Sequence, residues 1–520
     1  MLKFNFVKRL SHLTRISLLL AVFFALDKGL GIFRQVYIAR QFVIPEQDAF
    51  NVANNLPDLL YALISGGALS LALIPVLSST LTKEGRSAAW GIFSRIANLA
   101  FLVTGGLSLI IAFLAQYIVG WKFGIAPGFS VAQQHLVINL MRLDLIGTLI
   151  FSISGLIMSG LQANQHFLLP AIAPIMYNLG QIFGAVILAP GQSVHIGPLH
   201  LPAFGMGVYG LTYGVILGAM LHLLIQVPGL IRFQFQWTPR IDLRNTQVIA
   251  SLRLLGPRIA TMFFIQYIFL ARDNIASYAG VGAISALTYG WMIMQVPETL
   301  IGTAIGTALL PTLSEEAARG ELSAFQQTAQ RAIQVILALT LPVAAILALG
   351  LQPLLELAFG AKFQGAQMAV LVGVTQANLA GIVAHSLIEV GSRSFYALKD
   401  AKTPLIISGL NALVFTVAAI GLMGPLGAPG VALANTISYT MEAFLLLYLL
   451  GRRLPLRFNF EATLLRAVAA SLLGGAFAWV FSSGWLIHTH VSVLSVVGMA
   501  FAAVVSLPLV WKEVRLLVRL

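Results

Sequence analysis

Cysteine is absent from this chain, and charged residues make up only 9% of it. Without cysteine the protein forms no disulfide, thiolate nucleophile or thiolate-bound metal site. The sequence also lacks the His/Glu spacing of zinc enzymes, a phosphate-binding P-loop and a strand context for a dinucleotide-binding turn. We therefore predict that the protein is not an enzyme. Any transport it performs would use an ion gradient, the membrane potential or the gradient of the substrate itself.

Apolar residues dominate what is present. They account for 58% of the chain, and a mean hydropathy of +0.89 excludes an ordinary soluble protein. The net charge of +13 is spread over short segments between apolar runs. Such a distribution is typical of membrane orientation signals, so we expect a membrane partner and no nucleic acid.

The lengths of the apolar runs predict an all-α polytopic membrane protein with about 14 transmembrane helices, because a span needs about 20 apolar residues. The first run resembles a secretory signal, but it is longer and carries Asp27 and Lys28, so we expect it to be retained. The predicted spans are residues 18–42, 50–80, 90–119, 131–161, 168–188, 204–230, 248–279, 281–313, 325–349, 366–398, 405–422, 427–450, 464–481 and 491–511.

Basic residues alternate between the predicted loops. The loops on one side hold nearly all of them, and the opposite loops hold chiefly Lys122 and Lys362. The positive-inside rule then predicts a multi-pass membrane protein with both termini in the cytoplasm.

An internal repeat relates two parts of the chain. The motif at residues 56–60 and 73–78 has a counterpart at 296–300 and 309–314, about 240 residues later. Pro170 and Asn178 correspond in the same way to Pro404 and Asn411. The repeat predicts two six-helix lobes, residues 1–232 and 233–452, in parallel around a central cavity, with two additional transmembrane helices in residues 453–520.

Proline and glycine interrupt the repeated spans. Kinks are expected at the prolines, and the glycines allow close packing or bending, so these positions are candidate gates or hinges: Pro57, Gly66, Gly67, Pro297 and Pro311. Packing alone would also explain the glycines. Thr403 and Pro404 are expected to begin a helix, with Thr403 as its cap.

Charges within the spans are the functional candidates. A central charge costs about 2.5–3.5 kcal/mol to insert, so Asp27, Lys28 and Arg34 are expected to face protein or water. Asp27 and Arg34 share one helical stripe, about 20° apart. Lys28, Arg34 and Arg272 would suit an anionic, phosphate-bearing lipid. The alternative for the first two cations is snorkelling to the interface, and for Arg272 with Asp273, as for Glu389 with Arg393, a local ion pair.

Other polar residues in the spans receive narrower predictions. His222 and His385 are expected to be packing residues. A coupling cation would bind near Asn411, Thr436 and Glu442.

Several motifs resemble one family. They are similar to motifs of the MurJ/MviN lipid II flippases, which belong to the multidrug/oligosaccharidyl-lipid/polysaccharide exporter superfamily. The similar stretches are residues 48–50, 55–60, 67–70 and 74–77, the eighth-span motif around Pro297, Gly302, Gly306 and 310–314, and the loop 395–404.

This resemblance implies a flippase of the bacterial cytoplasmic (inner) membrane that moves lipid II, an undecaprenyl-pyrophosphate-linked peptidoglycan precursor, from the inner to the outer leaflet by alternating access. It would serve cell-wall synthesis and cell shape, with the cell-wall synthesis machinery as a further partner. We expect no cofactor, and coupling to Na⁺, to protons or to the membrane potential. By position, Arg34 matches a cavity arginine, Lys28 a usual arginine and Asp48 an acidic residue of the family. The chain departs from the family at Tyr61 and Met292, where arginines are usual.

Alternatives from other classes stay open. These are an exporter of another polyprenyl-linked glycan or of drugs, a membrane enzyme acting on lipid-linked sugars, and a non-transporting cell-wall scaffold. A drug site would favour acidic residues over cations, and an enzyme would need an acid/base cluster for which the loops are too short.

Overall fold

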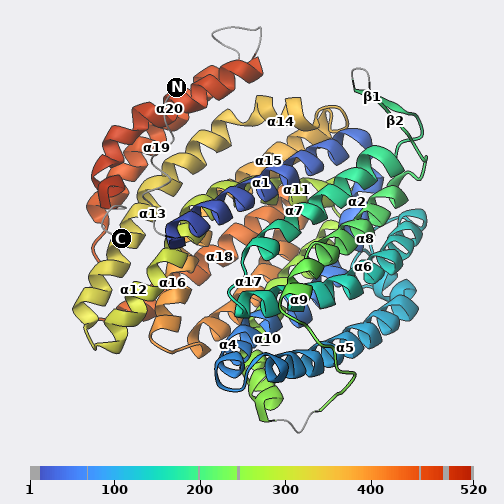
Figure 1. Cartoon of the computed structure of the whole chain (residues 1–520). Helices are drawn as coiled ribbons and strands as arrows, with labels where there is room; N and C mark the ends of the chain where they lie inside the picture. Colours follow the sequence, from blue (N-terminus) through green and yellow to red (C-terminus); the bar gives the residue numbers. More distant parts are fainter. Residues whose placement is uncertain are drawn as a thin grey trace, which may run out of the picture. The chain divides into compact units, whose positions relative to one another are not determined.

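The computed structural model of the chain describes residues 12–66, 68–196, 199–242, 246–455, 458–483 and 491–516 (Figure 1). The chain divides into two compact units, Met1–Phe263 (unit 1) and Phe264–Leu520 (unit 2). The boundary falls within helix α10 (Thr246–Ala276), about 30 residues after the lobe boundary predicted at residue 232. Residues 453–520, predicted to be an additional helix pair, belong to unit 2.

Unit 1 is built from helices and one short hairpin. Its elements are α1 (His12–Gln41), α2 (Ile44–Ala53), α3 (Asn55–Leu60), a π-helical segment (Tyr61–Gly66), α4 (Ala68–Lys83), α5 (Arg86–Gly120), α6 (Val131–Ala163), α7 (Leu168–Phe183), a second π-helical segment (Gly184–Leu188), the antiparallel strands β1 (Val194–Ile196) and β2 (Leu199–Leu201), α8 (Val208–Leu224) and α9 (Val227–Arg232).

Helix α6 is the centre of unit 1 and packs against α2, α4, α5 and α8. At one end the ring of Trp90 meets Phe93 and Phe235 edge to face, and its Nε1 donates to the carbonyl of Phe233 at 2.9 Å. Helices α7 and α8 approach so closely that a Cβ at Gly180 would lie 2.3 Å from the Cα of Gly218. Small residues thus set the spacing that brings α7 into the bundle.

Unit 2 follows a similar order of helices. Its elements after the boundary in α10 are α11 (Ala283–Glu298), a π-helical segment (Thr299–Thr303), α12 (Ala304–Ala318), α13 (Leu322–Gly350), α14 (Gln352–Phe359), α15 (Ala366–Ala380), α16 (Ile382–Ala397), α17 (Lys402–Leu426), α18 (Ala428–Gly451), α19 (Glu461–Ser482) and α20 (Val491–Val514).

Helix α13 is the centre of unit 2, because it packs against α12, α15 and α16 on one side and against α19 and α20 on the other. Its buried residues Phe325, Ile333 and Ile336 share one apolar core with Phe395 of α16 and Leu446 of α18. The C-terminal pair α19 and α20 therefore extends this unit by covering α13.

The all-helical membrane fold is confirmed apart from the small hairpin. Among the described residues, 11 helices are long and apolar enough to cross a membrane. Each of the 14 predicted ranges overlaps a helix, but the count of 14 spans stays a prediction. The hairpin and α14 were not predicted, because three-residue strands and an eight-residue helix are too short for hydropathy to detect.

The repeat is visible in the backbone. Gln165 after α6 and Lys399 after α16 lie 234 residues apart, and both have φ of +59°. In each turn the next residue donates its N–H five residues back, from His166 to Leu161 and from Asp400 to Phe395, both at 2.9 Å. The same left-handed helix ending thus precedes the helix that begins near Pro170 or Pro404.

The predicted breaks also recur in both units. Pro57 lies in α3 just before the π-helical segment Tyr61–Gly66, and Pro297 lies near the end of α11 just before the π-helical segment Thr299–Thr303. Pro311 lies inside α12, Gly66 ends the first π-helical segment, and Gly67 lies outside the described residues. These segments are the irregularities expected where proline disturbs a helix.

The predicted cap of the eleventh span is wrong. Helix α17 begins at Lys402, and the N–H groups of Lys402 and Thr403 donate to Oδ1 of Asp400, each at 3.0 Å. The hydroxyl of Thr403 donates to Oδ2 of Asp400 at 2.6 Å. The carboxylate of Asp400 thus accepts hydrogen bonds from two backbone N–H groups at the helix start. The Thr403 hydroxyl does not cap the helix, because a carboxylate oxygen is a stronger acceptor than a hydroxyl.

Candidate functional site

Two charges of α1 meet one amide of α7. Asn178 donates from Nδ2 to Oδ1 of Asp27 at 2.7 Å, and its Oδ1 accepts from Nη1 of Arg34 at 2.9 Å. Asn178 is 6% exposed, so these bonds form where water is scarce. Gly31 lies between the two charges, and a Cβ there would be 3.8 Å from Oδ1 of Asn178. The predicted shared stripe of Asp27 and Arg34 is confirmed, and it faces α7.

Arg34 is only partly satisfied by this contact. Its Nε is buried and has no hydrogen-bond partner among the described residues. The charges of Asp27 and Asp58 act on its guanidinium, and the Tyr177 hydroxyl lies close to it. A half-buried arginine with donors left over is suited to bind an anion through a planar fork.

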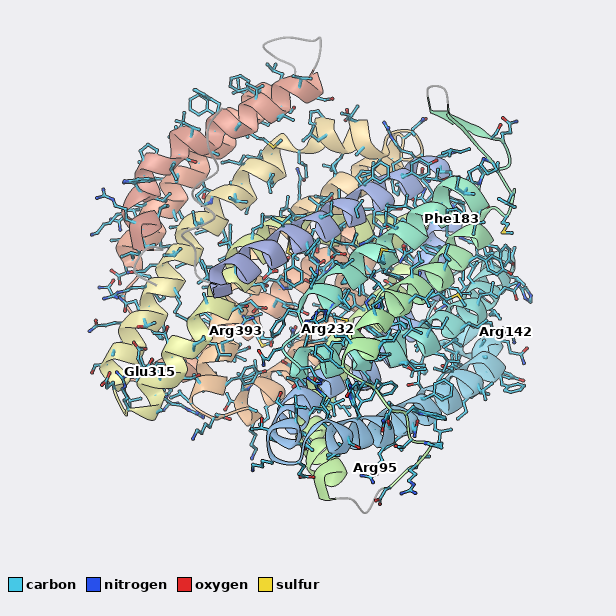
Figure 2. All side chains as sticks on the ribbon, viewed as in Figure 1. Arg95, Arg142, Phe183, Arg232, Glu315 and Arg393 are labelled. Atoms are coloured by element: carbon cyan, nitrogen blue, oxygen red, sulfur yellow. The ribbon has the colours of Figure 1, made fainter. Side chains whose placement is uncertain are left out.

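Asp144 of α6 is a deeply buried carboxyl group. It is 1% exposed, and neither of its oxygens is bonded to a described residue. Arg142, two residues earlier, is exposed and donates from Nε to the carbonyl of Ala112 on α5 at 2.9 Å (Figure 2). Arg142 therefore does not pair with Asp144, and the charge of Asp58 acts on the buried carboxyl group.

Aromatic rings surround Tyr61, the position at which the resemblance leads us to expect an arginine. Tyr61 lies 5.4 Å from Phe151 between ring centroids, and Phe151 meets Tyr177 at 4.6 Å and His222 at 5.1 Å. His222 also bonds to the hydroxyl of Ser154 at 2.6 Å. The histidine is a satisfied packing residue, as predicted. His385 in unit 2 is likewise held, with Asn435 at 3.2 Å from its Nε2.

The other two predicted binding residues of unit 1 differ in accessibility. Lys28 of α1 is exposed and forms no ion pair with a described residue. Asp48 of α2 is fully buried, and α2 packs against α6 and α8. Lys28 is therefore available to a ligand, whereas Asp48 is not reached from solvent in this conformation.

Arg272 in unit 2 has a partner beside it in the chain. Its Nε donates to Oδ1 of Asp273 at 2.6 Å, and its guanidinium lies 5.1 Å from the ring centre of Phe269. Together with Trp291 and Asn378 it lines a cavity of about 10 Å³, room for about one water molecule. The alternative of a local ion pair therefore holds for this arginine.

The candidate cation site is partly assembled. Glu442 of α18 accepts from Nδ2 of Asn411 at 2.5 Å and from the hydroxyl of Ser408 at 3.0 Å. Oδ1 of Asn411 is buried without a partner among the described residues. Thr436 does not join them, because its hydroxyl donates to the carbonyl of Ala377 at 2.7 Å. No group of three or more His, Cys, Asp or Glu side chains suited to a metal occurs in the described residues.

A second charged group of unit 2 is also a local pair. Arg393 and Glu389 form an ion pair one turn apart on α16, and Nη2 of Arg393 donates to the hydroxyl of Thr307 at 3.2 Å (Figure 2). A Cβ at Gly306 would lie 2.4 Å from Nη1 of Arg393. The glycine thus lets α12 lie against the arginine.

Sequence reasoning did not identify Asn178 or Tyr177 as site residues. Asn178 lies 144 residues from Arg34, and no local pattern links the two. Its correspondence with Asn411 in the repeat was the available signal, because both asparagines bind a carboxylate of another helix.

Comparisons with known proteins place this arrangement in a family. The family model described as Lipid II flippase MurJ matches residues 42–505. The Lipid II flippase MurJ of Burkholderia cenocepacia is 28% identical over 451 residues, covering 85% of this chain and 84% of the relative. The Probable lipid II flippase MurJ of Rhizobium meliloti is 28% identical over 465 residues, covering 86% of this chain and 84% of the relative.

Solved structures agree on the fold. The structure titled "Lipid II flippase MurJ, inward closed conformation" has a TM-score of 0.74 at 20% identity, covering 94% of this chain and 99% of its own. An inward-facing multidrug resistance MATE family transporter of the MOP superfamily has a TM-score of 0.70 at 14% identity, covering 82% and 94%. Because the family match spans most of a multi-pass membrane protein with the predicted fold, this chain belongs to the lipid II flippase MurJ family.

Proposed function

We propose that this protein moves lipid II from the inner to the outer leaflet of the bacterial cytoplasmic membrane by alternating access, with both termini in the cytoplasm. The observation that carries the proposal is Arg34, held by Asn178 within an apolar bundle and with donors left for an anion. A cation within a membrane span costs free energy to insert, so its presence indicates a functional partner. The pyrophosphate of an undecaprenyl-linked precursor supplies oxygens that an arginine can bind.

Lys28 would extend the same binding surface. It lies on α1 one turn or more from Arg34 and is exposed. The two cations would bind the pyrophosphate while the lipid tail stays in the bilayer. Arg272 is a weaker candidate for this role, because Asp273 already balances its charge.

The proposed coupling ion would bind in unit 2. The carboxylate of Glu442 and Oδ1 of Asn411, which has no partner among the described residues, are oxygen ligands of the kind that a sodium ion prefers. Glu442 is 4% exposed, and its hydrogen-bond donors Ser408 and Asn411 are neutral, so a bound Na⁺ or a proton would balance its charge. Thr436 is left out of this proposal.

Complementation tests the proposal. The wild-type gene is expressed in a bacterium depleted of its own lipid II flippase, and lipid II exposed at the outer leaflet is measured alongside growth. Rescue with restored exposure is the expected result. Growth without restored exposure would indicate a scaffold for cell-wall synthesis, and neither rescue nor exposure would contradict lipid II as the cargo.

A related cargo is favoured by one observation. Tyr61 and Met292 stand where the resemblance places arginines, and Tyr61 belongs to an aromatic cluster. Fewer cations would suit a polyprenyl-linked glycan that carries fewer negative charges than lipid II. Assaying a second undecaprenyl-linked glycan in the same cells distinguishes the two cargoes, since only the transported one changes leaflet when the protein is expressed.

A further inference from the structure

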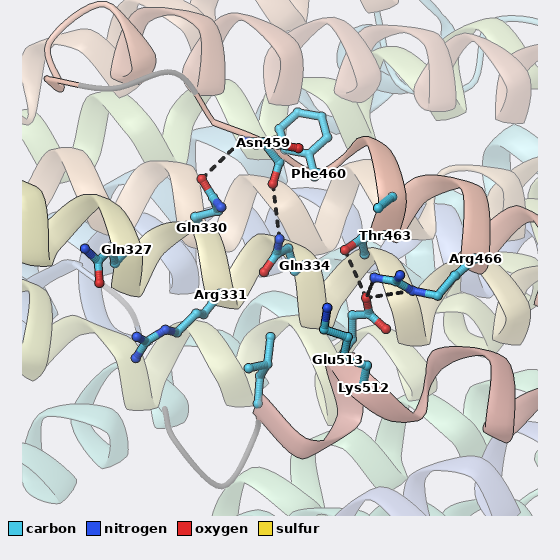
Figure 3. A pocket seen from close by; sticks show the side chains of 12 residues that line it. Gln327, Gln330, Arg331, Gln334, Asn459, Phe460, Thr463, Arg466, Lys512 and Glu513 are labelled. Carbon is cyan, nitrogen blue, oxygen red and sulfur yellow. Dashed lines mark hydrogen bonds and ion pairs between the residues drawn. The ribbon is translucent and has the colours of Figure 1, made fainter.

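A polar cavity of about 420 Å³ lies within unit 2, where the first turns of α13 meet the start of α19 and the end of α20 (Figure 3). Its size is within the range of ligand pockets, about 300–1,000 Å³. None of its residues belongs to the predicted substrate or cation sites. Its lining consists of Gln327, Gln330, Arg331, Gln334, Asn459, Phe460, Ala462, Thr463, Arg466, Lys512, Glu513 and Leu516.

The packing of the three helices explains why a cavity forms at this end. Farther along, Ala338 of α13, Ala467 and Ala470 of α19 and Val510 of α20 form a small apolar core, so the backbones lie close together. Toward the start of α13 the facing residues become long and polar. Such side chains do not fill an apolar core, because their ends need hydrogen-bond partners or water.

The α13 wall repeats polar residues at helical spacing. Gln330 accepts from the N–H of Asn459 at 3.1 Å, and Gln334 donates to the carbonyl of Asn459 at 3.1 Å (Figure 3). These two glutamines hold the segment before α19 in place. Arg331 lies between them in sequence and forms no hydrogen bond or ion pair with a described residue. The side chains on this side of the cavity are therefore held in place, and the Arg331 guanidinium is left to bind a ligand.

The opposite wall carries one balanced pair and one further cation. Arg466 forms an ion pair with Glu513 through Oε1, and the hydroxyl of Thr463 donates to the same oxygen at 3.1 Å. Glu513 is only 2% exposed, and its Oε2 has no partner among the described residues. Lys512 is exposed and also forms no ion pair there. The lining therefore has a net charge of about +2 and one unsatisfied buried acceptor.

We propose that this cavity binds the headgroup of an anionic phospholipid whose headgroup also bears hydroxyl groups. Arg331 and Lys512 would donate to the phosphate oxygens, and Oε2 of Glu513 would accept from a headgroup hydroxyl. Basic pockets between transmembrane helices are suited to such headgroups. A bare phosphate would use the cations but leave Oε2 unsatisfied, and a choline headgroup would bring a cation with no N–H or O–H to donate.

The leaflet follows from the predicted orientation. The cavity lies near the start of α13, next to the loop that holds Arg319, and basic loops are expected to face the cytoplasm. The ligand would therefore be a lipid of the inner leaflet. Helix α13 is the centre of unit 2, so the lipid would bind near the N-terminal end of the helix against which the other helices of this unit pack.

Lipid binding to the purified full-length protein tests this inference. Native mass spectrometry in detergent gives dissociation constants for phosphatidylglycerol, phosphatidylcholine and soluble glycerol phosphate. We expect phosphatidylglycerol to bind about tenfold more tightly than phosphatidylcholine, and the double variant Arg331→Gln/Lys512→Gln to lose that preference, since two charge-assisted contacts are removed. Lys512→Gln alone should lose part of it.

A matched double variant controls for net charge. Arg319, just after α12, pairs with Glu315 of that helix, and Arg515 lies over Trp511, so Arg319→Gln/Arg515→Gln removes the same charge outside the cavity. It should keep the phosphatidylglycerol affinity within about twofold of wild type. The thermal midpoint without lipid shows that each variant is folded. Equal phosphatidylglycerol binding by wild type and the cavity double variant would overturn the proposal, as would equally tight binding of glycerol phosphate.

Discussion

The two units hold corresponding asparagines in opposite electrostatic settings. In unit 1, Asn178 links the cation Arg34 to the anion Asp27. In unit 2, Asn411 and Ser408 both donate to Glu442, and no cation is paired with that carboxylate in the described residues. The same position of the repeat therefore carries a balanced pair of charges in one unit and a single anion in the other.

This difference indicates a division of roles. A guanidinium held in place beside a carboxylate can exchange that neighbour for an anionic ligand without leaving a buried charge unpaired. A lone carboxylate with neutral donors gains instead from a small cation or a proton. We infer that unit 1 binds the anionic cargo and unit 2 binds the coupling ion, and each half of this inference can be tested separately.

The largest effect is expected for Arg34→Ala. Removing the guanidinium takes away the proposed anion ligand and leaves Asp27 without its countercharge. Rescue of a flippase-depleted bacterium should be lost completely while the protein is still present in the membrane at wild-type amounts. Arg34→Lys should rescue only partly, since lysine keeps the charge but not the planar fork.

Arg142→Ala is the matched control within the same unit. Arg142 also lies on a membrane-spanning helix, but it bonds to a backbone carbonyl of α5 instead of Asn178. Its loss should leave rescue intact. Full rescue by Arg34→Ala, with immunoblots at wild-type intensity, would remove Arg34 from the site.

The next largest effect is expected for Glu442→Gln. The amide keeps the size of the side chain and removes the negative charge that a cation would balance. Lipid II exposure should fall about tenfold and should no longer vary with sodium at fixed pH or with pH at fixed sodium. The measurement is the leaflet assay in cells or vesicles over both titrations.

Glu356→Gln serves as the control for this change, because Glu356 is exposed and its Oε1 accepts a hydrogen bond from Gln352 at 3.0 Å. It should keep the ion dependence of wild type. If Glu442→Gln retains that dependence as well, the coupling ion binds elsewhere. Only the proposed role of unit 1 in binding the anionic cargo would then remain.

A smaller effect on stability is expected from glycine substitutions. In unit 2 a Cβ at Gly302 would lie 2.7 Å from the Cα of Ser386, so Gly302→Ala should cost about 1–3 kcal/mol through overpacking. In unit 1 nothing lies within 4 Å of a Cβ at Gly29, so Gly29→Ala should be neutral or stabilising. Thermal unfolding of the purified variants gives the comparison, and equal midpoints would mean that α16 moves aside freely.

Much of the fold follows from hydropathy. The long apolar runs predicted α5, α6 and α13 closely, and the repeated proline motifs predicted irregular helix at corresponding places. The nature of the irregularity, a π-helical segment after Pro57 and again after Pro297, was not predictable. Proline identifies where a hydrogen bond is lost, but the packing of neighbouring helices decides how the turn is closed.

The site was predictable only as far as local geometry reaches. The 100° rotation per residue placed Asp27 and Arg34 on one face, and the structure agrees. The spacing could not show that Arg272 turns to Asp273, since adjacent residues point about 100° apart and only the side-chain conformation joins them. Thr436 was grouped with Glu442 by composition, whereas α15 provides its partner.

The smallest effects concern the two equivalent turns outside the membrane spans. Although burial acts to raise it, the pKa of Asp400 is lowered to about 2 by hydrogen bonds from the hydroxyl and N–H of Thr403 and by Arg453. At the matching turn of unit 1, burial and then the charge of Arg232 lower the pKa of His166 below its usual value of 6.5. Both depressed pKa values favour the deprotonated form in the folded protein.

Stability should therefore fall on acidification in two separate windows. The contribution of Asp400 is complete above its unfolded pKa of about 3.9 and is lost as the pH falls toward 2. That of His166 is complete above its unfolded pKa of about 6.5 and is lost as the pH falls from there toward its lowered folded pKa. Asp400→Asn should cost about 1 kcal/mol at pH 7, because Asp400 accepts hydrogen bonds from the start of α17, whereas its ion-pair partner Arg453 is 47% exposed and adds little. Thermal unfolding of wild type, Asp400→Asn and His166→Gln between pH 7 and 3 checks this.

The difference in stability between wild type and Asp400→Asn should stay constant down to about pH 5 and narrow below pH 4. His166→Gln should reduce only the loss of stability near pH 6. A gap that narrows already between pH 7 and 5 would mean that Asp400 is not held as its hydrogen bonds indicate, and the two turns would then differ in more than the residue they carry.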